Sequence, residues 1–226
     1  MNFPPEEDPT MKVVNRRDFK VMCWDKWLGY AQIGEYMPRT FWVGEKKNLN
    51  KVLPLIKTDW IVLKPFNGLK GIGIFIGPKE KAQNAEFVGK NPKYIAQEFV
   101  DTSKGILGIT DGLHDLRVAV VNNKVVWSHV RIPLQGTYTA NAARGGDLRE
   151  VSYEKQVPGS VKKIVNAVKT RLNKKYDNPT YSLDFGLENH IPKIFEINDQ
   201  IGFPKWEMKA RDIFLKELVE SFKQKL

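Results

Sequence analysis

The sequence predicts an α+β protein of two lobes, in which antiparallel sheets are flanked by helices. Pairs of short β-branched segments follow one another with only a tight turn between them, which is typical of antiparallel hairpins. Segments with apolar residues at helical spacing separate these pairs. A polar, glycine-containing stretch at 101–114 follows the strand YIAQEFV. We therefore expect a tail at 1–17, a small lobe at 18–97 and a large lobe at 98–226.

The first half opens with a helical, aromatic-rich pattern from Asp18 to Ile33. A proline break at 38 leads to a short strand at 41–43, and a short lysine-rich helix ends near the next proline at 54. The segments WIVLKP and GIGIFIG read as strands joined by a glycine-rich, basic loop. A helix at about 79–88 and the strand YIAQEFV complete this half.

The second half contains two hairpins and two helices. Asn122 and Asn123 separate DLRVAVV from KVVWSHVRI, and paired asparagines tolerate the positive φ that a tight hairpin turn requires. A helix with one apolar face begins near Ser160. TYSLDFGL and PKIFEIN form the second strand pair, and a closing helix carries Phe214, Leu218 and Phe222.

Composition narrows the functional classes. The net charge of +10 favours anionic partners, although many of the lysines lie in helical segments where they also fit a solvated face. No zinc-finger or aromatic RNA-binding pattern accompanies the charge, which argues against nucleic acid. Cys23 is the only cysteine, and no apolar run approaches the roughly 18 residues that span a bilayer. We expect a cytoplasmic protein with no membrane partner.

The first candidate site joins Lys64, at the end of a strand, to Gly68, Gly71 and Gly73. Glycines let backbone amides approach a phosphate closely, and lysine supplies a compact positive charge. The next element is a strand and no Gly-Lys-Ser/Thr follows, so the pattern differs from the strand-to-helix phosphate loop. It fits a hairpin loop that closes over phosphates, or an ordinary glycine-rich hairpin.

The second candidate site consists of Asp184, Glu196 and Asn198. Glu196 and Asn198 are two residues apart, so on a strand both face the same side, and a paired strand can bring Asp184 beside them. Oxygen ligands of this kind suit Mg²⁺, which prefers a few carboxylates together with phosphate oxygens and water. Acidic residues at alternate positions of an apolar strand are costly to bury without a cation.

The third candidate site is a set of guanidinium groups. Arg117 and Arg131 lie on the two strands of the predicted hairpin that turns at Asn122 and Asn123, and Arg144 lies in the loop NAARGG. Arginine forks match the oxygens of phosphates and carboxylates. Each arginine taken alone also fits a surface charge on the solvent side of a sheet.

In order and spacing, these segments resemble the ATP-grasp superfamily, in particular its branch of glutathione synthetase and the ribosomal-protein glutamate ligases. The resemblance runs from about Trp24 to Asn198, and it implies a nucleotide in the cleft between the two lobes. It rests on the following stretches: WDKWLGY, MPRTFWV, VLKPFNGLKGIGI, YIAQEFV, HDLRVAVVNNKVV, the arginine of VRIP, TANAARGG, SLDFG and FEIN.

The resemblance implies a role for each candidate residue, with ATP and Mg²⁺ as cofactors and Mn²⁺ as an alternative metal. Lys26 and Lys64 would contact ATP phosphates beneath a lid formed by the Gly68, Gly71 and Gly73 loop. The arginines would face the transferred phosphate or the acyl substrate, and the trio Asp184, Glu196 and Asn198 would hold the metal. The remaining nucleotide contacts would come from Gln97, Glu98, Phe99 and Val100 at the adenine, Asp115 at the ribose and Asn141 near the phosphates.

Two departures from the family pattern concern the substrate side. Family ligases usually carry a further N-terminal α/β domain, and barely twenty residues precede the Asp-Lys helix here. We therefore expect a partner subunit or a homo-oligomer in its place. In addition, the usual Asn-x-x-Pro-Gly reads Asn198-Asp199-Gln200-Ile201-Gly202, with the proline delayed to Pro204.

The leading hypothesis is an ATP-dependent carboxylate–amine ligase that forms an amide or peptide bond through an acylphosphate. Its partners would be a carboxylate substrate and an amine acceptor, each a small molecule or a peptide. One alternative is an ATP-grasp kinase that stops at phosphoryl transfer to a small molecule. The other is a non-catalytic nucleotide-binding module that acts within a complex.

Overall fold

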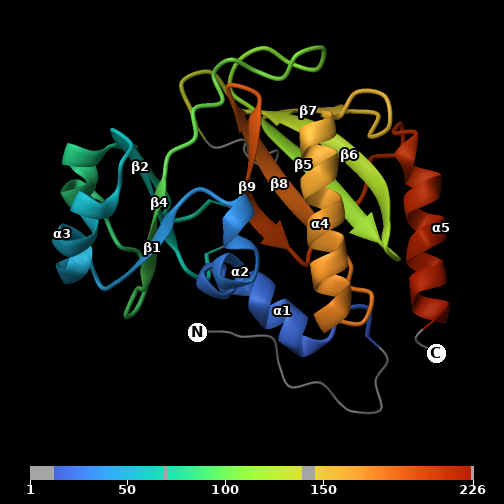
Figure 1. The fold of residues 1–226 in the computed structure, drawn as a ribbon, viewed down its shortest axis with the longest axis horizontal. Helices are drawn as coiled ribbons and strands as arrows, with labels where there is room; N and C mark the ends of the chain where they lie inside the picture. Colours follow the sequence, from blue (N-terminus) through green and yellow to red (C-terminus); the bar gives the residue numbers. More distant parts are fainter. Residues whose placement is uncertain (1–12, 69–70, 139–145, 225–226) are drawn as a thin grey trace.

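The protein is built on two antiparallel sheets. The computed structural model describes residues 13–68, 71–138 and 146–224. The smaller sheet, in the left half of Figure 1, has the order β1 (Thr40–Gly44), β4 (Tyr94–Glu98), β2 (Trp60–Pro65), β3 (Phe75–Pro78). The larger sheet has the order β7 (Asp147–Glu150), β6 (Lys124–Ile132), β5 (Asp115–Val121), β8 (Tyr181–Glu188), β9 (Ile191–Asn198). The α+β class with two antiparallel sheets is confirmed.

The smaller sheet has one apolar face and one face turned towards the larger lobe. Ile61 and Leu63 of β2 lie in the small core, whereas Val62 and Lys64 line a cavity on the opposite side, as expected for a strand with a period of two. Short helical segments cover the apolar face: η2 (Lys46–Asn48), α3 (Leu49–Val52), η3 (Leu53–Leu55) and η4 (Lys79–Asn84). The helix expected over 79–88 is a 3₁₀ helix that ends at Asn84.

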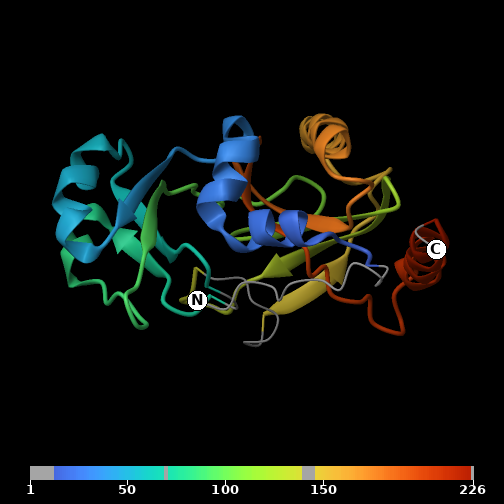
Figure 2. The same cartoon turned by 90° about the horizontal axis from the view of Figure 1, so that it is seen from below.

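The larger sheet carries helices on both faces. Its core face packs against α1 (Arg17–Trp24) and α4 (Gly159–Lys175), whose buried side chains include Phe19, Val161 and Leu172. Helix α5 (Ala210–Lys223) packs on the opposite face against β5 and β6. Figure 2 shows α1 and α4 on one side of this sheet and α5 at its end far from the small lobe.

A helix break near the N-terminus differs from the single helix expected from Asp18 to Ile33. Asp25 separates α1 from α2 (Lys26–Ile33), and its carboxylate accepts hydrogen bonds from the backbone N–H groups of Trp27 and Leu28. This N-cap starts a second helix directly at Lys26. The buried side chains of α1 belong to the larger core, so the segment expected in the small lobe from residue 18 packs with the large one.

The predicted hairpin turn after β5 adopts the expected conformation. Asn122 and Asn123 have φ values of +50° and +57°, and Asn189 and His190 at the β8–β9 turn also have positive φ. Such a turn matches the twist of the strands that it joins. It also sets the register of each hairpin, and therefore which side chains face each other across the sheet.

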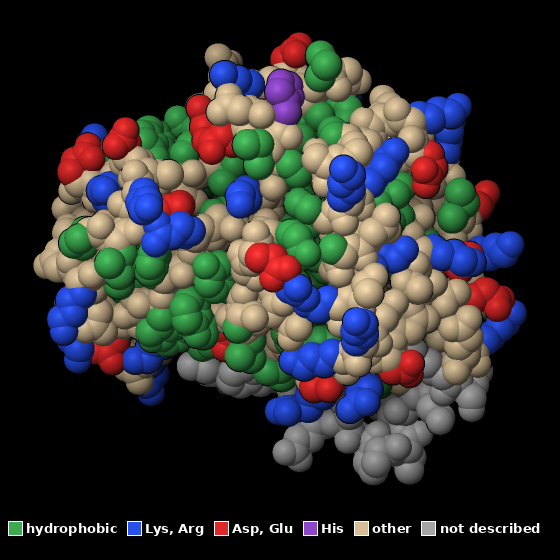
Figure 3. Space-filling view, in the orientation of Figure 1, with side chains coloured by type: hydrophobic (Ala, Val, Ile, Leu, Met, Phe, Trp, Pro, Cys, Tyr) green, Lys and Arg blue, Asp and Glu red, His purple; other side chains and the backbone are tan. Residues whose placement is uncertain are grey.

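Much of the positive charge lies on solvated helix surface. Lys163, Lys174 and Lys175 of α4 are exposed, and Figure 3 shows lysine and arginine side chains spread over the large-lobe half of this face. The solvated-face interpretation therefore accounts for part of the charge. Within the described ranges, no helix combines the length and the apolar character needed to cross a bilayer.

Candidate active site

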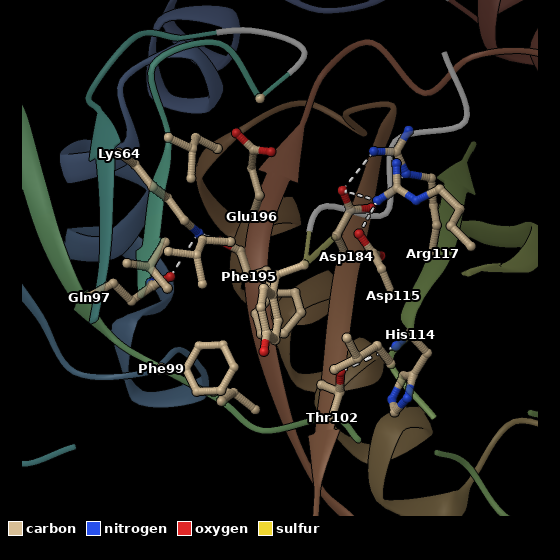
Figure 4. A pocket seen from close by; sticks show the side chains of 18 of the residues that line it. Lys64, Gln97, Phe99, Thr102, His114, Asp115, Arg117, Asp184, Phe195 and Glu196 are labelled. Atoms are coloured by element: carbon tan, nitrogen blue, oxygen red, sulfur yellow. Dashed lines mark hydrogen bonds and ion pairs between the residues drawn. The ribbon is translucent and has the colours of Figure 1, made fainter. Parts of the chain in front are cut away.

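A cavity of about 360 Å³ lies between the two sheets. Side chains from β2, β3 and β4 line it on the small-lobe side, and side chains from β5, β6, β8 and β9 line it on the other. Lys64 and Glu196, which are far apart in the sequence, both line this cavity and face each other across it in Figure 4. Its size and its position between two lobes are typical of a small-molecule site.

Lys64 projects from β2 into the cavity and is held by two acceptors. Its Nζ donates to Gln97 Oε1 at 2.8 Å and to the backbone carbonyl of Phe195 at 3.3 Å. Gln97 is itself fixed because its Nε2 donates to Thr40 Oγ1 at 3.0 Å, so both ends of this buried amide have protein partners. Burial lowers the pKa of Lys64 to about 8, although Glu196 opposes the shift.

Lys26 connects the glycine-rich loop to the predicted metal ligands. Its Nζ lies 3.0 Å from Glu196 Oε1 and donates to the backbone carbonyl of Gly68 at 2.8 Å. The side chain is only 9% exposed, and the backbone N–H of Lys26 donates to the carbonyl of Phe66. The N-cap at Asp25 thus places the first residue of α2 directly under the loop.

The glycine-rich loop is anchored at its far end. Gly71 and Gly73 have φ values of +72° and +73°, a region that glycine adopts without strain. Tyr94 Oη donates to the carbonyl of Gly73 at 3.0 Å and accepts from the backbone N–H of Val88 at 3.0 Å. A Cβ on Gly73 would lie 2.7 Å from Tyr94 Oη, so this position requires glycine for space as well.

The segment expected to contact the adenine forms one wall of the cavity. Gln97, Glu98, Phe99 and Val100 all line it. Glu98 Oε1 accepts from the backbone N–H of Lys57 at 3.0 Å, which orients its carboxylate towards the small lobe. The Phe99 ring lies with Trp60 and Tyr138 in an aromatic cluster with centroid distances of 5.0 to 6.0 Å.

Four charged side chains meet on the opposite wall. Arg117 binds Asp184 through two hydrogen bonds, Nε to Oδ1 at 2.6 Å and Nη2 to Oδ2 at 2.7 Å. Arg131 Nη2 contacts Asp184 Oδ2 at 2.8 Å and also donates to Asp115. The register explains this meeting, because Arg117 lies opposite Asp184 on β8 and Asp115 lies opposite Arg131 on β6.

This cluster is buried and incompletely paired. Burial alone would raise the pKa of Asp184, but Arg117 and Arg131 outweigh it and hold that pKa well below its usual range. Burial raises the pKa of Asp115 to about 7 despite the charge of Arg131. Among the described residues, Asp115 Oδ1 and Arg131 Nε have no hydrogen-bond partner. Buried polar atoms of this kind usually bind water or a ligand.

The predicted metal ligands occupy adjacent strands. Asp184 lies opposite Glu196 and Ser182 lies opposite Asn198, and Asn198 Nδ2 donates to Asp184 Oδ2 at 3.2 Å. Two carboxylates and an amide oxygen fit Mg²⁺ by their chemistry. Lysine and arginine side chains pair with both carboxylates here. Over the residues that the structure describes, no three His, Cys, Asp or Glu side chains form a metal cluster, and the predicted third ligand is an asparagine.

Several cavity residues were absent from the sequence prediction. Phe195, Thr102, His114 and Tyr138 line the cavity in addition to apolar side chains of β2 and β3. Alternation with Lys64 identifies Val62. Strand alternation does not identify Phe195, because a β-bulge in β9 places it on the same side of the sheet as its neighbour Glu196. Two predicted residues, Asn141 and Arg144, lie outside the described residues.

Two histidines near the site, His114 and His129, are buried. His114 Nδ1 lies 3.1 Å from the carbonyl of Gly112, and its Nε2 accepts from the backbone N–H of Leu187 at 3.2 Å. Burial lowers the pKa of His114 and lowers that of His129 to about 3. The His129 ring is therefore neutral near pH 7.

Two sheets that enclose a cavity, with a lysine-bearing hairpin on one side and carboxylates on the other, define the ATP-grasp class of fold. Solved structures support this class. The phosphoribosylamine–glycine ligase of Thermotoga maritima matches with a TM-score of 0.66 and 13% identity over 94% of this chain and 57% of that chain. A RimK domain ATP-grasp protein of Sphaerobacter thermophilus matches with a TM-score of 0.60 and 13% identity, over 92% and 70%.

The family model described as the RimK-like ATP-grasp domain matches residues 24–178, which is more than half of the chain. The chain therefore belongs to the RimK-like ATP-grasp domain family. This result confirms the resemblance that the sequence motifs indicated.

Curated relatives carry the name probable alpha-L-glutamate ligase. The protein of Vibrio parahaemolyticus is 27% identical over 176 residues, which cover 76% of this chain and 53% of that protein. The protein of Methanococcoides burtonii is 26% identical over 172 residues, covering 74% and 51%. The chain thus spans about half the length of these relatives.

Proposed function

We propose that this protein is an ATP-dependent carboxylate–amine ligase. The observation that carries the proposal is that Lys64 and Glu196, from two different lobes, line one cavity together with Arg117. This arrangement gathers cations for phosphate oxygens beside oxygen ligands for Mg²⁺. Family membership and the fold of ATP-grasp ligases support it.

The base and the phosphates of ATP would occupy different parts of the cavity. The apolar side chains around Phe99, Val62 and Phe195 suit a planar base, and the strand after Gln97 offers backbone groups to its edge. Lys26 and Lys64 suit the phosphates, with the glycine-rich loop above them. Asp115 is held by Arg131 in this structure, so a ribose contact would require that pair to rearrange.

Asp184, Glu196 and Asn198 would hold Mg²⁺, which neutralises phosphate oxygens when bound. The chain's own task is to position and balance charge. Arg117 and Arg131 would face the oxygens that gain charge as a substrate carboxylate takes the γ-phosphoryl group. The products of that step are an acylphosphate and ADP. An amine then attacks the acyl carbon, phosphate leaves, and an amide forms.

The names of the relatives indicate which substrates to test first. The relatives named probable alpha-L-glutamate ligases make L-glutamate the first compound to test, and the sequence hypothesis of a small-molecule or peptide carboxylate adds carboxylate peptides. The basic surface favours an acidic partner.

The test is incubation with Mg-ATP, L-glutamate and a mixture of carboxylate peptides. A ligase releases ADP and phosphate and adds the mass of glutamate minus water. A kinase releases ADP and yields a phosphorylated product without free phosphate, and nucleotide binding without turnover identifies a binding module. Glu196→Ala with Asn198→Ala should abolish turnover, whereas Glu220→Ala with Asn166→Ala, at a partly exposed position of α5 and an exposed position of α4, should not. Intact turnover in the first pair would overturn the metal assignment.

A further inference from the structure

A β-bulge gives Phe195 its place in the cavity. Asp184 pairs with Glu196 but the next residue, Phe185, pairs with Ile194, so Phe195 is the extra residue of β9. Such a bulge breaks the alternation of the strand. Phe195 and Glu196 both line the cavity, while Ile194 and Ile197 on either side of them lie in the large core.

The ring of Phe195 lies directly over Gly186 of the neighbouring strand. A Cβ on Gly186 would lie 2.0 Å from Cζ of Phe195, 2.7 Å from Cε2 and 2.8 Å from Cε1. Gly186 does not have a positive φ, so its backbone conformation suits any residue. Glycine is therefore required at this position for space alone. Any side chain at 186 must push the ring away from β8.

The direction of that displacement is towards the cavity. Gly186 alternates along β8 with Asp184 and Ser182, which face the cavity side, whereas Phe185 and Leu187 lie in the core. Figure 4 shows the Phe195 ring in the middle of the cavity, between Lys64 on one wall and Asp184 on the other. Val62 and Ile76 of the small sheet line the same cavity.

We infer that Gly186 is a positioning residue that sets the width of the slot for the nucleotide base by leaving room for the far end of the Phe195 ring against β8. This inference rests on the proposed ATP site. The backbone carbonyl of Phe195 accepts from Lys64 at 3.3 Å, so the bulge stays in place while the ring alone must move. A methyl group at 186 narrows the slot but leaves the phosphate-binding lysines in position.

The test compares ATP with inorganic tripolyphosphate, which lacks the base, by calorimetry on the full chain with Mg²⁺. Gly186→Ala should weaken ATP binding by at least about tenfold, the usual scale of an overpacked site, and leave tripolyphosphate binding within about twofold. Gly159→Ala is the matched control, because a Cβ at that position meets nothing within 4 Å. Equal ATP affinity in Gly186→Ala and the wild type would overturn the inference.

A second variant separates crowding from misfolding. The three clashing atoms of Phe195 lie beyond Cδ, and leucine has no atom there. Gly186→Ala combined with Phe195→Leu should therefore recover ATP affinity to within about threefold of Phe195→Leu alone, even where Gly186→Ala alone does not fold. If the double variant stays as impaired as Gly186→Ala, Gly186 does not act through Phe195. A wild type that binds neither ATP nor tripolyphosphate would instead contradict the proposed function.

Discussion

The ammonium group of Lys26 lies 3.0 Å from the carboxylate of Glu196, and the same group donates to the carbonyl of Gly68. One lysine therefore joins the start of α2, the predicted lid loop and a predicted metal ligand. Glu196 is half-buried, so a partner for its charge stabilises the site. A divalent cation that binds Glu196 must displace the ammonium group of Lys26. The displaced ammonium group is then free to bind phosphate.

Removing this lysine should strengthen metal binding in the absence of nucleotide. For Lys26→Met we expect Mn²⁺ affinity to rise about fivefold. This factor corresponds to the loss of a competing ion pair that contributes about 1 kcal/mol. ATP affinity should fall, because the proposed phosphate contact is lost. Electron paramagnetic resonance of free Mn²⁺ measures the first effect, and Lys163→Met on the exposed face of α4 is the control. Weaker Mn²⁺ binding in Lys26→Met would show that the two cations do not compete.

Nucleotide affinity should depend on pH through Lys64. Its pKa is lowered by burial to about 8, so the ligand-free protein loses this charge as the pH rises above 8. ATP binding should then weaken by up to about tenfold per pH unit and take up a proton. Calorimetry between pH 6.5 and 9.5, in buffers of different ionisation enthalpy, measures both effects.

The same group affects stability with the opposite sign. Between about pH 8 and the usual value of 10.5, the unfolded chain binds more protons at Lys64 than the folded one, so the stability contributed by this residue rises with pH.

The variant Lys64→Arg tests the origin of the pH dependence of ATP affinity. In Lys64→Arg the charge persists throughout, and the pH dependence of ATP affinity should disappear. A variant that keeps the wild-type profile would assign the dependence to another group.

The buried charge cluster should make Arg131 important for stability. Arg131→Met leaves Asp115 without its arginine and Asp184 with Arg117 and Asn198, and we expect a loss of about 3 to 5 kcal/mol in the free energy of unfolding. Urea denaturation monitored by tryptophan fluorescence measures it. Arg171→Met, which breaks an exposed pair with Glu35, should cost far less. Equal costs for the two variants would show that the cluster is not a source of stability.

Two glycines of the predicted lid loop, Gly71 and Gly73, should differ although their backbone conformations are alike. Alanine at Gly71 or Gly73 adopts positive φ at a cost of about 1 to 2 kcal/mol. Only at Gly73 does the added methyl group also meet Tyr94 Oη, so Gly73→Ala should lose more stability and more ATP affinity. Denaturation and calorimetry on both variants check this order. The reverse order would indicate that Tyr94 does not anchor the loop.

The sequence by itself determined the two-lobe α+β fold and most of the residues around the cavity. Strand periodicity places Glu196 and Asn198 on one face and Val62 beside Lys64, because side chains of a strand alternate with a period of two. The motif order was sufficient to indicate the family. These features are local or depend on spacing along one chain, and a single sequence carries them directly.

Only the tertiary structure decided how the charges pair and where Phe195 lies. The helix break at Asp25, the bulge in β9 and the space above Gly186 depend on contacts between segments far apart in the chain. A bulge changes which neighbours share a face without altering composition or periodicity elsewhere. The pairing of Arg117 with Asp184 likewise follows from strand register, which long-range packing of the hydrophobic core fixes and which local sequence does not encode.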